Sequence, residues 1–84
     1  MTPNQLVEIV KDLAEHKPEV LEHLRVWAGL EKPFVCSDIE KEDAMRIAEG
    51  LGLITITQTP VPTKYGLLAI EFNRSEMNDV GVNG

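Results

Sequence analysis

Two histidines and a single cysteine are the side chains in this 84-residue sequence that are best suited to metal binding or nucleophilic chemistry. His16 and His23 lie seven residues apart with Pro18 between them, and Cys36 follows thirteen residues later. A zinc site normally uses closely spaced Cys or His pairs, and the sequence has neither a second cysteine nor a His-x-x-x-His pair. We therefore expect two surface histidines near helix ends and a buried thiol, with no metal and no cofactor.

Carboxylates and a serine form a second group that could do chemistry. Glu40, Glu42 and Asp43 lie within four residues, but acid/base catalysis needs a cleft that separates the pKa values of two carboxyl groups. Acids at the start of a helix complement its dipole, and Ser37 followed three residues later by Glu40 matches a capping box. These roles account for the residues without catalysis, so we predict a protein that is not an enzyme and has no catalytic residue.

Composition limits the class of protein. The chain is 43% hydrophobic and 26% charged, which is typical of a globular domain, and 14 acids against 8 bases give a net charge of −6. One cysteine permits no intramolecular disulfide, and a small secreted domain usually needs such bonds. The amino end lacks the pattern of a signal peptide. We predict a cytoplasmic protein.

The elements that would position these residues follow from apolar spacing. Side chains recur at the helical period in three segments, which predict helices over residues 4–16, 18–28 and about 38–50. Between the second and third helices, residues 34–36 are apolar and predict a short, buried strand.

After the third helix the period changes from 3.6 to 2. Residues 53–57 and 66–72 alternate apolar and other side chains, which predicts a hairpin whose long tip is residues 58–65. Residues 73–84 show little apolar periodicity, and we expect a flexible C-terminal tail there. The predicted domain therefore spans residues 1–72.

This order of elements resembles a winged helix-turn-helix domain over about residues 34–72. The segment from Ala44 to Ile54 is similar to the end of a recognition helix followed by the entry into the wing. The resemblance implies an α+β fold of three helices followed by a β-hairpin, with the third helix able to enter a DNA major groove. About ten residues separate the second and third helices, where the family has a turn of three or four. A generic α+β domain, with three helices covering a hairpin, is the alternative.

The resemblance also implies a set of DNA-contacting residues: Lys41, Met45 and Arg46 on the third helix and Lys64 on the wing. However, residues 38–50 hold five acids and two bases, a formal charge of −3. DNA-binding proteins of typical strength make about 6–10 phosphate contacts, whereas the eight bases here are scattered from residue 11 to residue 74. A dimeric DNA-binding transcriptional regulator is thus the alternative hypothesis.

The leading hypothesis is an acidic interaction module that binds a basic protein, such as a nucleic-acid-binding protein. An acidic surface attracts a basic partner, and aromatic and Met side chains commonly anchor interfaces. The residues predicted to contact the partner are Glu42, Asp43, Met45, Glu49, Val61 and Tyr65. The chain would then act as a small accessory or inhibitor protein.

Overall fold

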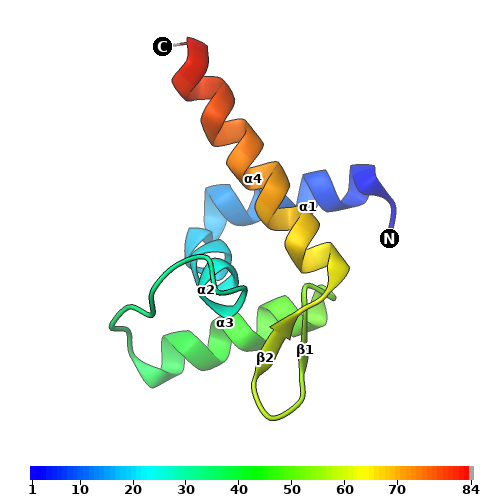
Figure 1. The fold of residues 1–84 in the computed structure, drawn as a ribbon. Coiled ribbons are helices and arrows are strands. Elements are labelled where there is room, and N and C mark those ends of the chain that lie inside the picture. The colour runs from blue at the N-terminus through cyan, green and yellow to red at the C-terminus, as the bar shows by residue number, and fades with distance from the viewer. Residues whose placement is uncertain (84) are drawn as a thin grey trace.

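Four helices and a two-stranded antiparallel sheet make up the fold (Figure 1). The computed structural model describes the backbone of residues 1–83 and the side chains of residues 1–75. The elements are α1 (Pro3–His16), α2 (Pro18–Trp27), α3 (Asp38–Gly50), β1 (Ile54–Ile56), β2 (Pro60–Pro62) and α4 (Lys64–Asn83). Three helices precede a β-hairpin, as predicted for the α+β class, and the arrangement is compatible with a winged-helix-like shape. A fourth helix follows the hairpin.

The first two helices begin and end where the sequence predicts them, within one residue. Thr2 caps α1: its side chain accepts a hydrogen bond from the Gln5 N–H (3.2 Å), and the Gln5 side chain accepts one from the Thr2 N–H (2.9 Å). Pro18 ends α1 and occupies the first position of α2. Gly29, with a φ of 77°, follows α2 in the left-handed conformation. In Figure 1, α1 crosses the view and α2 is seen nearly end on, so the two helices form a corner.

The third helix and the hairpin also form, although the hairpin is shorter than predicted. Gly52, with a φ of 77°, reverses the chain after α3 and leads it into β1. The register pairs Ile54 with Pro62 and Ile56 with Pro60. Only residues 57–59 separate the two strands, so β2 lies inside the segment predicted to be the hairpin tip.

The prediction of a second strand at residues 66–72 is wrong, because this segment forms the first half of α4. Its buried residues are Gly66, Ala69 and Ile70, which are spaced three and four apart as on one face of a helix. Leu68, which the strand pattern would place with Ile70 on one face, is exposed. A short apolar run fits both periods, and the helical one prevails here.

The start of α4 is set by close packing at the base of the hairpin. The Thr63 hydroxyl donates to the Gly52 carbonyl (2.6 Å) and accepts from the Gly66 N–H (3.2 Å), which caps the helix. The Thr63 N–H donates to the Leu53 carbonyl (2.9 Å). A Cβ at residue 66 would collide with that same Leu53 carbonyl oxygen, so only glycine fits there.

Residues 73–83 continue α4, where the sequence predicts a tail without regular structure. The C-terminal end of this helix extends away from the other elements (Figure 1). Asn73 belongs to the body, because its side-chain oxygen accepts a hydrogen bond from the Arg25 guanidinium (3.1 Å). Gly84 lies outside the described residues.

The predicted strand at residues 34–36 is absent from the described chain: these residues form part of a connector, residues 28–37, without regular structure. The strand was expected to be buried, but Phe34 is exposed and Val35 is fully exposed. Strands β1 and β2 pair with each other, and the connector adds no third strand to their sheet.

All four helices and the hairpin contribute to one hydrophobic core. Its fully buried members are Leu6, Val10, Leu13, Val20, Leu21, Leu24, Ala44, Ala48, Leu53, Ile54, Ala69 and Ile70. Within the described part of the chain, none of the helices combines the length and the apolar character required to cross a bilayer.

Candidate functional site

The outward face of α3 is the first candidate site. Ala44 and Ala48 are buried against the core, so the opposite side of the helix faces solvent. That side carries Ile39, Glu42, Arg46 and Glu49, whose spacings of three and four residues place them in one stripe. We call these four residues the α3 stripe.

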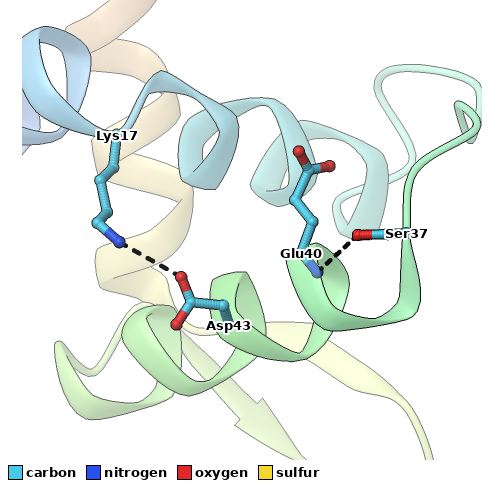
Figure 2. Close-up of polar contacts among 4 residues, drawn as sticks. All are labelled: Lys17, Ser37, Glu40 and Asp43. Carbon is cyan, nitrogen blue, oxygen red and sulfur yellow. Dashed lines mark hydrogen bonds and ion pairs between the residues drawn. The ribbon is translucent and has the colours of Figure 1, made fainter.

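Two of the acids on α3 are engaged within the fold. The Asp43 carboxylate accepts a hydrogen bond from the Lys17 ammonium (3.3 Å), which ties α3 to the junction of α1 and α2 (Figure 2). The Glu40 N–H donates to the Ser37 hydroxyl (3.1 Å), the first half of the predicted capping box. The Glu40 side chain does not complete the box, because it turns toward α2 (Figure 2). There a carboxylate oxygen lies 3.6 Å from the Nε2 atom of His23.

The acids of the α3 stripe have no such partner. Among the side chains of residues 1–75, no basic group lies within ion-pair distance of Glu42 or Glu49. Arg46 lies between them in the sequence and is the one basic residue of the α3 stripe. The outward side of α3 therefore keeps a net negative charge.

The residues predicted to bind a partner do not all share one surface. Glu42 and Glu49 lie on the α3 stripe, but Asp43 faces Lys17 at one flank of the helix. Met45 is half-buried against the core. The two remaining predicted residues lie beyond α3.

Those two residues come from the hairpin and from α4. Val61 is exposed on β2, whereas Tyr65 at the start of α4 packs partly against the core. The Lys64 ammonium lies 5.2 Å from the centre of the Tyr65 ring.

The residues of the DNA-binding alternative are likewise dispersed. Lys41 and Arg46 are exposed on α3, Met45 is half-buried, and Lys64 is exposed at the start of α4 beside an aromatic ring. Elsewhere, Lys17 pairs with Asp43, and Arg25 pairs with Glu31 at 2.8 Å. The basic side chains therefore occupy several elements and do not form one strip.

Sequence reasoning missed the exposed apolar residues of the connector and of the first turn of α3. The exposed fractions are 59% for Leu30, 102% for Val35 and 80% for Ile39, which begins the α3 stripe. Phe34 is also exposed, at 38%. The available signal was that Leu30, Phe34 and Val35 lie within three residues of Pro33 and do not belong to a sustained helical or strand period. Exposed apolar side chains such as these are available for burial against a partner.

A second candidate site joins His23 on α2, Cys36 in the connector and Glu40 on α3. The His23 Nε2 atom lies 3.9 Å from the Cys36 Sγ atom and 3.6 Å from a Glu40 carboxylate oxygen. His23 is 4% exposed, which corrects the prediction of a surface histidine, and Cys36 is half-buried instead of buried. His16 is exposed near Asp12, as predicted, and takes no part in the cluster.

Aromatic rings hold the histidine of this cluster in place. The centre of the His23 ring lies 5.5 Å from that of Trp27, on which it stacks, and 4.7 Å from that of Phe34. Partial removal from water raises the pKa of the Cys36 thiol, and the hydrogen bond and negative charge of Glu40 raise the same pKa further. The thiol therefore stays protonated at neutral pH, which does not suit a nucleophile.

An open cleft of about 590 Å³ lies between the end of α1 and the second half of α3. Leu13, Ile47 and Leu51 supply apolar lining, and Lys17 and Arg46 also line the cleft. Lys17 is engaged with Asp43, which reduces the positive charge available there.

No protein-family model matches the chain, and no curated protein and no solved structure matches it significantly. Its function is therefore inferred from the surfaces and side-chain clusters described above.

Proposed function

We propose that the chain is a non-enzymatic interaction module that binds a basic protein through the α3 stripe and the adjoining connector. The observation that carries this proposal is the pair of exposed carboxylates, Glu42 and Glu49, without a basic partner among residues 1–75. Surface charges of this kind are available to a partner, whereas the paired acids of α3 are not.

Charge alone would give attraction with little affinity, because exposed ion pairs contribute about 0.2–1 kcal/mol each. The exposed apolar residues Val35 and Ile39 supply the surface that a partner can bury. Ile39 lies one helical turn from Glu42, so apolar and acidic contacts adjoin each other. An apolar centre with a charged rim is the usual anatomy of a protein interface.

A basic partner fits this surface better than a duplex does. The whole chain carries −6 and residues 38–50 carry −3, which would attract a basic protein and speed its encounter. An accessory or inhibitor protein that covers the basic surface of a nucleic-acid-binding protein would likewise need exposed acidic side chains beside exposed apolar ones.

Charge reversal on the stripe tests the proposal. The double substitution Glu42→Lys and Glu49→Lys should weaken partner binding by on the order of tenfold, because it removes two attractions and adds two repulsions. The partner is first captured from the native cell by the unmodified chain, and its affinity for each variant is then measured with purified proteins.

The matched control is the double substitution Glu8→Lys and Glu71→Lys, which makes the same change in net charge at exposed positions on α1 and α4. This control should bind within about twofold of the unmodified chain at physiological salt, where distant charges are screened. Alanine at Lys41 and Arg46 should also have little effect. Equal losses in the two double variants, or a larger loss from the alanine variant, would contradict the proposed site.

A further inference from the structure

We propose that His23, Cys36 and Glu40 form a binding site for a divalent transition-metal ion of the Zn²⁺ type. One donor atom of each residue, the His nitrogen, the Cys sulfur and a Glu oxygen, lies within 4.8 Å of the other two. The three residues come from α2, the connector and the start of α3, so the fold itself brings them together.

The spacing of these atoms fits a tetrahedral site. Zinc bonds of about 2.0–2.3 Å at tetrahedral angles place the ligand atoms about 3.3–3.6 Å apart. The His23 nitrogen is 3.6 Å from the Glu40 oxygen and 3.9 Å from the Cys36 sulfur. The Cys36 sulfur and the Glu40 oxygen lie within 4.8 Å of each other, so side-chain movements of about 1 Å would complete the geometry, with solvent as the fourth ligand.

The chemistry of the donors selects the class of metal. On binding, the ion would displace the proton of the Cys36 thiol to solvent, and the resulting thiolate and the imidazole favour Zn²⁺ and similar ions, whereas Mg²⁺ and Ca²⁺ prefer sites made of oxygen atoms. The buried imidazole is held by the rings of Trp27 and Phe34, so one ligand is already positioned. Cys36 is half-buried and Glu40 is exposed, which leaves a path for the ion to enter.

The site also accounts for the unusual direction of the Glu40 side chain. The hydroxyl of Ser37 already caps the first turn of α3 through the Glu40 N–H. The Glu40 carboxylate is thereby free to reach across to α2, where it meets the imidazole. A bound ion would fasten the connector to both helices, so metal should stabilise the folded chain.

The experiment uses the reduced, metal-free full chain, titrated separately with Co²⁺ and Zn²⁺. We expect one ion per chain, a thiolate-to-cobalt charge-transfer absorption band, and a rise in Tm of at least about 5 °C when Zn²⁺ is 100-fold above its Kd. Cys36→Ser should abolish the charge-transfer band. Glu40→Gln, which keeps the capped N–H, should weaken Zn²⁺ binding about 10–100-fold.

The controls are Glu42→Gln, the same change on the outward face of α3, and His16→Gln, which removes the surface imidazole. Both should bind Zn²⁺ as the unmodified chain does. Far-UV circular dichroism checks that each variant is folded. The proposal is overturned if the unmodified chain shows no charge-transfer band, if Glu40→Gln binds like Glu42→Gln, or if His16→Gln loses binding. Cys36 lies in the connector that the proposed function also uses, but the metal titration needs no partner and none of the three ligands is substituted in the test of partner binding, so failure of one proposal is distinguishable from failure of the other.

Discussion

Ser37 stands where the exposed connector becomes α3, and two features meet at this residue. Its hydroxyl accepts a hydrogen bond from the Glu40 N–H (3.1 Å) and so satisfies one of the free N–H groups of the first helical turn. The same hydrogen bond fixes the position of the Glu40 backbone, from which the side chain reaches His23. A single cap thus helps to determine both where α3 begins and how its first carboxylate is directed.

Loss of this cap should be measurable. Ser37→Ala is expected to lower the free energy of unfolding by about 1 kcal/mol, because it leaves the Glu40 N–H without its side-chain partner. Ser37→Asp restores an acceptor at the cap and should remain within a few tenths of a kcal/mol of the unmodified chain. Urea denaturation followed by circular dichroism measures both. An alanine variant as stable as the original would show that the cap contributes nothing.

At the residue scale, the sequence predicts the Ser37 cap but not the environment of the histidines. Capping depends on residues three apart in sequence, so the pattern is local and visible. The burial of His23 depends on Trp27, Phe34 and Cys36 meeting around it, which requires the path of the connector. No local pattern specifies that path, and the candidate metal site therefore appears only in the structure.

Among the elements, α4 depends most on one close contact. Gly66 lies where α4 crosses the base of the hairpin, against the backbone of Leu53. A glycine inside a helix usually destabilises it by about 0.5–1 kcal/mol relative to alanine. Here the absence of a side chain is what allows the helix to approach the hairpin.

Two glycine substitutions should therefore have opposite effects. Gly66→Ala is expected to lower the free energy of unfolding by about 1–3 kcal/mol, because its methyl group would overlap the Leu53 carbonyl. Gly50→Ala, in α3, meets no atom within 4 Å and should raise stability by up to about 1 kcal/mol. Thermal and urea unfolding of the two variants and of the unmodified chain measure both changes in the free energy of unfolding. A stabilising Gly66→Ala would show that α4 is not packed as described.

Element prediction succeeds where the apolar pattern is long and fails where it is short. The helices α1, α2 and α3 span ten or more residues with caps or breakers at their ends, so their periodicity is unambiguous. The apolar run at residues 66–72 fits a strand as well as a helix. Its helical state is decided by the Thr63 cap and the fit of Gly66 against Leu53, both of which are contacts with preceding residues.

For the molecule as a whole, the distribution of charge matters more than its sum. The chain carries −6, and its basic side chains are dispersed over several elements, two of them in ion pairs at 3.3 Å and 2.8 Å. Neutralising a duplex requires several cations on one surface. Among the residues that the structure describes, the fold does not bring the basic side chains together on one surface.

A DNA titration should consequently give a negative result. The isolated chain is expected to retain no duplex DNA at 50 mM or at 200 mM salt, the range over which phosphate-driven binding changes about 10³–10⁵-fold. Fluorescence anisotropy with a labelled duplex measures this directly. Binding that is strong at low salt and lost at high salt would favour the DNA-binding alternative, with Lys41, Arg46 and Lys64 as the first residues to substitute.

The way in which Thr63 closes the hairpin has a practical consequence for engineering. Its hydroxyl and N–H hold the base of the hairpin to Gly52 and Leu53, while the tip at residues 57–59 is exposed and remote from that fastening. Each doubling of a flexible loop costs only about 0.6 kcal/mol in closure entropy. A foreign peptide inserted at the tip would thus leave the hydrogen bonds at the base of the hairpin in place. The chain could therefore serve as a small scaffold for epitope grafting.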